Sequence, residues 1–234
     1  MQLIKNKNNI LVFSEKISDS LTNAIRRYVS EIPILAVDEV EIFKNDSPLY
    51  DETIAHRIGL IPLKNKGVNE KNKIQLKLSV SKEGTIYSKD LKGNIDVVYD
   101  EIPITVLGKD QEIELLAIVK SGKGNEHSKF SPGIMFYRNM KNIKTGSKSK
   151  EISEIFSNCK NGCGNHVKIE NNKNYELDIC DSCENNLENL EIEVNDSDNI
   201  VISVESFGQI PVKEIFVSAV KELKKDLNEV EKKI

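Results

Sequence analysis

The stretch from 21 to 63, LTNAIRRYVSEIPILAVDEVEIFKNDSPLYDETIAHRIGLIPL, decides the fold of the first part of this chain. Leu21, Ile25 and Val29 recur every four residues, which predicts one apolar stripe along a helix. That helix is predicted to end before Pro33, because a proline disfavours helical geometry in the residue that precedes it. The stretch therefore begins with a short amphipathic helix.

A strand and a second helix are predicted to follow. Residues 34–43 mix apolar and acidic side chains in the manner of a strand. In the second helix Ser47 is expected to cap the N-terminus, Pro48 to occupy the first helical position and Gly59 to close the C-terminus. The predicted apolar stripe of this helix consists of Tyr50, Ile54 and Ile58.

Strands and loops are predicted for most of the chain between the second helix and the cysteines. Residues 6–9 are a polar stretch that suggests a hairpin turn near the N-terminus. Residues 74–80 alternate between apolar and polar side chains, as in a half-buried strand, and 64–140 continue in a similar pattern. The lysine-rich stretch 141–150 is predicted to be a solvated linker.

The chain ends in a predicted strand at 200–204 and a long amphipathic helix that can begin at Pro211. Apolar residues along this helix are spaced 4, 3, 4, 3 and 4, as in a coiled-coil seam. Either another part of this chain or a partner chain is expected to cover the seam. Ile215 and Ala219 widen the stripe, which favours packing on more than one neighbour. The terminal seam consists of Phe216, Val220, Leu223, Leu227, Val230 and Ile234.

The composition predicts a real core and no strong overall charge. Of the 234 residues 38% are hydrophobic, and 33 basic side chains nearly balance 37 acidic ones, for a formal net charge of −4. This balance argues against non-specific electrostatic binding to nucleic acid, so any contact with DNA is expected to be indirect. No apolar run approaches the roughly 18 to 20 residues that span a membrane, and the N-terminus lacks a signal-peptide pattern. We therefore expect a cytoplasmic protein without membrane contact.

The four cysteines are concentrated in one segment, which in a cytosolic protein favours a metal or cluster site over disulfides. Three residues separate Cys159 from Cys163, two separate Cys180 from Cys183, and sixteen lie between the two pairs. Two such thiolate pairs can supply the four ligands of one zinc ion. One iron–sulfur cluster at the same cysteines, or four simple thiols without a metal, are the alternatives.

The cysteine spacing also resembles the end of one ferredoxin motif and the start of the next. In the motif C-x2-C-x2-C-x3-C-P the last two cysteines have the spacing of the first pair here. However, Asn186 stands at the third position of the following motif, and Ser153 and Phe156 stand where the leading cysteines of the first belong. At most one site is therefore expected. His166 is a further ligand candidate, although a lone histidine there is more often a surface residue.

No catalytic constellation is evident in the sequence. His127 lies in the loop GKGNEHSKFSPG, which lacks the G-x4-G-K-[ST] spacing of a phosphate-binding loop. His56 lies beside Arg57 on the acidic second helix. Asp51 and Glu52 are interpreted as first-turn helix residues rather than as catalytic acids. The sequence by itself does not predict an enzyme.

Four stretches carry a family resemblance that covers nearly the whole chain. They are NAIRRYVSEIPILAVDEV at 23–40, DETIAHRIGLIPL at 51–63, EHSKFSP at 126–132 and VESFG at 204–208. Together they resemble the D subunit of archaeal DNA-directed RNA polymerase, which belongs to a family related to the bacterial alpha subunit and to the third-largest eukaryotic subunit.

The resemblance implies an α+β fold made of a split dimerisation domain and an inserted domain. The dimerisation domain, an antiparallel sheet with helices, is expected at 1–45 and 199–234. The insert domain, mainly β, is expected at 46–152 and 189–198. Residues 153–188 are expected to form a small subdomain, either degenerate ferredoxin-like or zinc-binding.

The resemblance also implies a non-catalytic assembly role in transcription. Family members pair with the small subunit L, are joined by subunits N and P, and form the platform for the two large catalytic subunits. On this analogy the terminal seam contributes to pairing with L, and the two N-terminal helices face other subunits. A free-standing metal or iron–sulfur protein with a redox role is the alternative from another class. The expected interface residues are Asn23, Arg26, Arg27, Phe216, Val220, Leu223 and Leu227.

Overall fold

The computed structural model describes residues 2–65, 74–144, 148–159, 163 and 174–233. The chain divides into two compact units. One contains Met1–Asn6, Val12–Asn23 and Phe136–Ser203, and the other contains Lys7–Leu11, Ala24–Met135 and Val204–Ile234.

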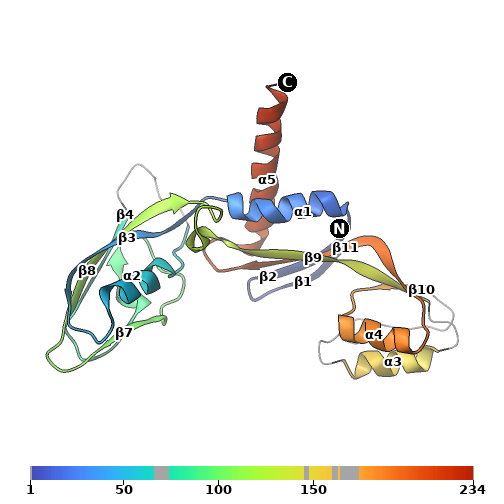
Figure 1. The fold of residues 1–234 in the computed structure, drawn as a ribbon, viewed down its shortest axis with the longest axis horizontal. Helices are drawn as coiled ribbons and strands as arrows, with labels where there is room; N and C mark the ends of the chain where they lie inside the picture. The colour runs from blue at the N-terminus through green and yellow to red at the C-terminus, as the bar shows by residue number, and fades with distance from the viewer. Residues whose placement is uncertain (1, 66–73, 145–147, 160–162, 164–173, 234) are drawn as a thin grey trace. The chain divides into compact units, whose positions relative to one another are not determined.

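A five-stranded sheet with the strand order β1-β2-β11-β9-β10 forms the base of the first unit. Strand β10 pairs antiparallel with β9. Helices α3 and α4 contact each other and lie side by side near β10 (Figure 1). The elements are β1 (Gln2–Lys7), β2 (Ile10–Lys16), β9 (Gly133–Lys144), β10 (Asn174–Leu177), β11 (Val194–Ser206), α3 (Ser149–Ser157) and α4 (Asp181–Asn189).

The predicted N-terminal hairpin is confirmed by β1 and β2. Asn8 and Asn9 connect the two strands and have positive φ values of 55° and 61°. Two central residues with positive φ are typical of the tight turn that matches the twist of a hairpin, and asparagine tolerates this geometry better than most residues.

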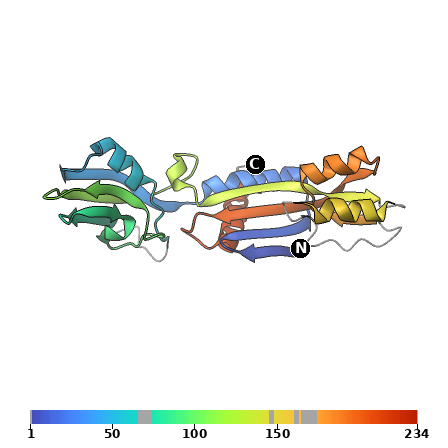
Figure 2. The same ribbon diagram turned by 90° about the horizontal axis from the view of Figure 1, so that it is seen from below.

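The second unit contains the four-stranded sheet β3-β8-β4-β6 and the two-stranded sheet β5-β7. β3 pairs antiparallel with β8, from Ile34 opposite Gly122 to Asn45 opposite Ile113. Helix α2 contacts β3 and lies on this sheet (Figure 2). The strands are β3 (Ile34–Asn45), β4 (Ile74–Val80), β5 (Gly84–Tyr87), β6 (Lys92–Gly93), β7 (Pro103–Leu107) and β8 (Ile113–Gly122).

Further helices complete the chain. Helix α1 (Asp19–Tyr28) is followed directly by the 3-10 helix η1 (Val29–Glu31), and α2 covers Asp51–Gly59. Two more 3-10 helices are η2 (Ser88–Asp90) and η3 (Ser128–Phe130). The C-terminal helix α5 covers Val212–Glu231, with Pro211 at its N-cap position, so the predicted terminal helix is confirmed.

The predicted strands at 34–43, 74–80 and 200–204 are confirmed as β3, β4 and part of β11. In β4 every second residue from Ile74 to Leu78 is buried, because one face of the strand packs on the core. The core of the second unit joins both sheets to α2. Its fully buried members include Ile54, Ile58, Leu63, Leu76, Leu78, Ile104 and Leu115.

The predicted start of α2 is wrong. The helix begins at Asp51 rather than at Pro48, and Ser47 does not cap it. The side-chain oxygen of Asn45 instead accepts hydrogen bonds from the backbone N–H and the hydroxyl group of Ser47, at 3.0 and 2.7 Å. These local hydrogen bonds hold the segment in a turn. Such bonds commonly offer the backbone an alternative to starting a helix. Tyr50 is 81% exposed and does not belong to the buried stripe.

The predicted apolar stripe of α1 is only partly confirmed. Ile25 and Val29 are buried, but Leu21 is 46% exposed and its neighbour Thr22 is completely buried. The hydroxyl group of Thr22 donates a hydrogen bond to the carbonyl oxygen of Ser18 at 3.0 Å, so burial leaves it satisfied. Positions 22, 25 and 29 share a helical face just as positions 21, 25 and 29 do. Sequence periodicity alone therefore does not decide which of the two faces is buried.

The predicted linker at 141–150 is wrong in its described parts. Residues 141–144 belong to β9, and α3 begins at Ser149. Lys141 Nζ lies 2.6 Å from a Glu184 oxygen and 2.8 Å from an Asp196 oxygen. Lys141 thus forms ion pairs with carboxylates more than forty positions away, although the lysine-rich stretch around it resembles a solvated linker.

The α+β class is confirmed by antiparallel sheets combined with helices. The division into dimerisation, insert and cysteine domains stays a prediction. Across the described ranges, no helix combines the length and the apolar content that crossing a bilayer requires.

Replacing Ile54 of α2 by alanine should destabilise the protein by about 2–5 kcal/mol, because its completely buried side chain would leave a cavity in the core. Urea unfolding would measure this loss. Val106→Ala is the matched control, since Val106 belongs to β7 of the same unit but is 51% exposed. Equal losses in the two variants would contradict the assigned core.

Candidate metal centre and docking surfaces

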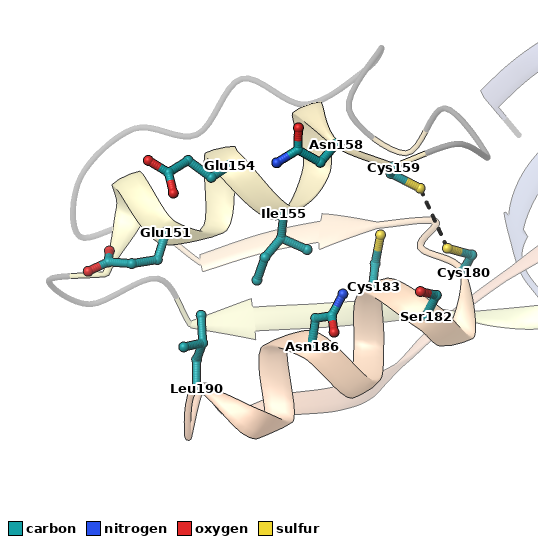
Figure 3. Close-up of a pocket in the computed structure, with 10 residues that line it drawn as sticks. All are labelled: Glu151, Glu154, Ile155, Asn158, Cys159, Cys180, Ser182, Cys183, Asn186 and Leu190. Carbon is teal, nitrogen blue, oxygen red and sulfur yellow. Dashed lines mark hydrogen bonds between the residues drawn. The ribbon is translucent and has the colours of Figure 1, made fainter.

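The four cysteines meet at one point of the first unit. Their Sγ atoms all lie within 4.8 Å of one another. The Sγ atoms of Cys159 and Cys180 are 3.6 Å apart (Figure 3). These four cysteines can therefore hold a metal ion, as their spacing in the sequence predicts.

Two helices position the cysteines. Cys159 follows the end of α3, and its N–H group donates to the carbonyl oxygen of Phe156 at 3.2 Å. Cys180 occupies the N-cap position of α4, and Cys183 lies in the first turn of that helix. The N–H group of Cys180 donates to Cys163 Sγ at 3.3 Å. Because the N-terminal end of a helix carries partial positive charge, this location favours thiolate ligands.

A small apolar core lies beside the thiols. It includes the fully buried Ile152 of α3 and Leu187 of α4, and Cys183 is itself only 2% exposed. Its buried members are Ile143, Ile152, Phe156, Ile179, Cys183, Leu187 and Ile192. Cores of this size rarely stabilise a fold by themselves, so a metal would add substantially to the stability of this segment.

Burial changes the acidity of the thiols. Loss of hydration raises the pKa of Cys163 to about 11, and it also raises the pKa of Cys183. A cation that binds thiolates must displace these protons. Metal binding at this site would therefore release protons and strengthen with rising pH.

Two ion pairs hold the cysteine-bearing segment against β9. The Arg138 guanidinium binds both carboxylate oxygens of Asp178, through Nε at 2.6 Å and Nη2 at 2.9 Å. Asp178 raises the pKa of Arg138, with a smaller contribution from Cys163. Lys141 binds Glu184, the residue after Cys183. The partners are about forty positions apart in the sequence, which is why sequence reasoning missed Arg138 and Lys141.

A pocket of about 740 Å³ opens beside the thiols (Figure 3). Asn186, which occupies the third position of the degenerate motif, lines this pocket. Phe156 is buried in the small core, and the Ser153 hydroxyl group donates to the Ser149 carbonyl oxygen at 2.9 Å. His166 lies outside the described residues. Besides Asn186, the residues that line the pocket include Glu151, Glu154, Ile155, Cys159, Cys180 and Cys183.

Helix α5 has two apolar stripes that differ in burial. Val212, Ile215 and Ala219 are buried within this chain. The described members of the terminal seam lie one position further along the helix and are at least partly accessible. Val220 is 36%, Leu227 59% and Val230 55% exposed, whereas Phe216 and Leu223 are half-buried. Ile234, its last predicted member, lies outside the described residues.

Asn23, Arg26 and Arg27 are exposed on α1. Arg26 and Arg27 line a pocket of about 590 Å³ together with Glu31 and Asn125. The Glu31 carboxylate accepts hydrogen bonds from Lys123 at 3.1 Å and from Asn125 at 2.7 Å, which fixes the wall of this pocket. The expected roles of Asn23, Arg26 and Arg27 in an interface stay predictions.

The loop at 126–132, which contributes to the family resemblance, is anchored to β3. Lys129 Nζ lies 2.7 Å from an Asp38 oxygen and 5.0 Å from the centre of the Phe130 ring. The His127 ring nitrogen Nδ1 accepts a hydrogen bond from the Lys129 N–H group at 3.1 Å. His127 therefore shapes the loop.

Part of the chain matches a known class of RNA polymerase components. Residues 30–135 match the RNA polymerase Rpb3/RpoA insert domain. DNA-directed RNA polymerase subunit Rpo3 of Methanocaldococcus jannaschii is 41% identical over 129 residues, which cover 54% of this chain and 68% of the relative. The Rpo3 subunit of Pyrobaculum aerophilum is 33% identical over 232 residues, covering 90% of this chain and 86% of the relative.

The chain belongs to the Rpo3 family of DNA-directed RNA polymerase subunits. This confirms the resemblance to the archaeal D subunit. The Rpo3 subunit of Pyrococcus horikoshii is 37% identical over 148 residues, and this match covers 58% of the chain but only 57% of the relative. Nothing in these comparisons supports a free-standing redox protein.

Replacing Asp38 by asparagine should reduce stability at neutral pH. The hydrogen bond from Lys129 lowers the pKa of Asp38. Its contribution is therefore present above the unfolded pKa of about 3.9 and is lost as the pH falls through the lower folded pKa. Both side chains are partly accessible, so we expect a loss of at most about 1 kcal/mol.

Urea unfolding at neutral pH and at a pH below the folded pKa of Asp38 would measure this difference. Glu39→Gln is the control, because it removes an exposed carboxylate one residue away and keeps the contact with Lys129. An Asp38→Asn penalty that is the same at both pH values would rule out the ion pair as its source.

Proposed function

We propose that this chain is a non-catalytic assembly subunit of DNA-directed RNA polymerase that supports DNA-templated transcription. In this role it pairs with the small subunit L through the terminal seam. The pair then forms the platform for the large catalytic subunits. The observation that carries the proposal is the accessible seam on α5, beside a stripe already buried in the chain.

The two stripes of α5 have different tasks in this proposal. Ile215 and Ala219 are completely buried and hold the helix in place. Leu227 and Val230 are more than half exposed and have the spacing of a helix–helix interface. Burying one such side chain contributes about 1.5–3 kcal/mol, so a few of them can offset the entropy lost on association. A second helix from subunit L is the occupant that this spacing fits.

Further subunits are proposed to bind elsewhere on the chain. Asn23, Arg26 and Arg27 offer exposed amide and guanidinium groups to subunits N and P or to the large subunits. Guanidinium groups bind carboxylates in a planar, two-bond geometry, which gives such contacts direction. The chain itself carries a net charge of −4, so DNA is reached through the complex. A cytoplasmic location and a metal at the cysteines, either zinc or one iron–sulfur cluster, belong to this proposal.

Replacing Leu223 and Leu227 together by aspartate should abolish pairing with subunit L. Two carboxylates would be buried without partners in the interface, and each costs several kcal/mol, so we expect affinity to fall by about 100-fold or more. Co-purification of the co-expressed subunits and a titration of the purified pair would measure the loss.

The matched control is Lys221→Asp with Asn228→Asp. It adds two carboxylates at exposed positions of the same helix, outside the seam. This control should still pair, and circular dichroism should show equal helix content in both double variants. Normal pairing by the Leu223→Asp, Leu227→Asp variant would refute the role of the seam.

Replacing all four cysteines by serine should leave pairing with subunit L intact. The small core beside the thiols shares no residue with the terminal seam. The variant should therefore lose bound metal and local stability, while its affinity for L remains that of the wild type. Loss of pairing after folding has been verified would show that the cysteine segment contributes to the interface.

A further inference from the structure

We infer that Cys159, Cys163, Cys180 and Cys183 bind one tetrahedral zinc ion and not the multi-iron cluster that a ferredoxin-like insertion implies. The inference concerns a site separate from the terminal seam. It deepens the metal part of the proposed function and is independent of the pairing with subunit L.

The distances between the sulfurs carry this inference. Zinc binds thiolate sulfur at about 2.3 Å, so neighbouring sulfurs of a tetrahedral site lie about 3.8 Å apart. The Sγ atoms of Cys159 and Cys180 are 3.6 Å apart, and no two of the four sulfurs are more than 4.8 Å apart. Four sulfurs within this limit need to move only slightly to reach the separations of about 3.8 Å that a single tetrahedral ion requires.

A cluster of several irons needs a wider arrangement. Each cysteine of a four-iron cluster binds a different iron atom, and sulfide ions lie between the irons. The cysteine sulfurs therefore surround the whole cluster rather than a shared ion. Sulfurs within 4.8 Å of one another leave no volume for such a cluster between them.

The neighbouring pocket does not provide the missing space. It is lined by Cys159, Cys180 and Cys183 but not by Cys163. A cluster placed there would lose its fourth cysteine. The nearest replacements are the carboxylates of Glu151 and Glu154 and the amide of Asn186, which are hard ligands that suit iron–sulfur chemistry poorly.

The donor set is that of a closed structural zinc site. Four thiolates fill the coordination of zinc and leave no open position for a substrate or water. The N–H group of Cys180 donates to Cys163 Sγ, which orients that ligand. Arg138 holds Asp178 two residues before Cys180, so the ligand-bearing turn is positioned by an ion pair as well.

Zinc at this point would connect α3 to α4. Cys159 follows the end of α3, whereas Cys180 and Cys183 belong to the start of α4. The ion would thus close the side of the small core at which the thiols lie. Folding of this segment is expected to depend on the metal, because the ligands come together only in the folded state.

The test begins with the full-length chain purified without oxygen and analysed for zinc, iron and acid-labile sulfide. We expect about one zinc ion per chain, without sulfide. X-ray absorption at the zinc edge should show one shell of sulfur at about 2.3 Å and no neighbouring metal. Iron with labile sulfide, a metal–metal distance, or no bound metal even after titration with zinc would overturn the inference.

Two variants separate ligation from general damage. Cys183→Ser should lose most of the zinc, whereas Ser182→Ala, which changes the pocket lining one residue away, should retain it. Because Cys183→Ser can also unfold the segment, cobalt titration of the wild-type chain provides a second measurement. Cobalt should give the absorption spectrum of a tetrahedral thiolate site, and zinc should displace it. An octahedral cobalt spectrum would contradict the four-sulfur site.

A negative result in these metal-binding tests would not contradict the assembly role, since pairing with subunit L is measured on the seam variants. Conversely, loss of the seam interaction would not change the zinc content.

Discussion

The close approach of β9 to β11 at Gly133 is the constraint on which the accessible seam depends. A Cβ atom at this position would lie 2.0 Å from the Glu205 carbonyl oxygen and 3.0 Å from Ile215 Cδ1. Only glycine permits this contact, so Gly133 lets Ile215 of α5 pack against the strands. With Ile215 and Ala219 packed inward, the rotation of α5 about its axis is fixed. The neighbouring stripe, which contains Leu227 and Val230, is then left accessible.

The sequence predicted those elements whose apolar periodicity is strong, as the alternation in β4 and the seam of α5 illustrate. It was less successful where two neighbouring faces are both plausible. In α1 Thr22 replaces Leu21 on the buried face, since its hydroxyl group is satisfied by Ser18. Near the start of α2, Ser47 donates its side-chain hydrogen bond to Asn45 instead of capping the helix, and such local competition is not visible in hydrophobic patterning.

The spacing of the cysteines along the sequence likewise predicts only part of the candidate metal site. Two cysteine pairs indicate that four thiols come together, but the same pairs fit both a single ion and a degenerate cluster motif. Our inference of a single ion uses the separation of the sulfurs instead, and this separation depends on how α3 and α4 pack. The ion pairs of Arg138 and Lys141 were not predicted, because their partners are distant in the sequence and none of these residues belongs to a recognisable motif.

The proposed metal centre and the proposed docking helix do not share a core. Among the described residues, the core beside the thiols contains no residue of α5. Local opening of a small core costs less free energy than global unfolding, so metal loss should act first on α3 and α4. The position of α5 depends instead on Gly133, Ile215 and Ala219, and Tyr28 adds a hydrogen bond to Asp226 at 2.9 Å. Since none of these contacts uses a cysteine, the geometry of the seam does not require the metal.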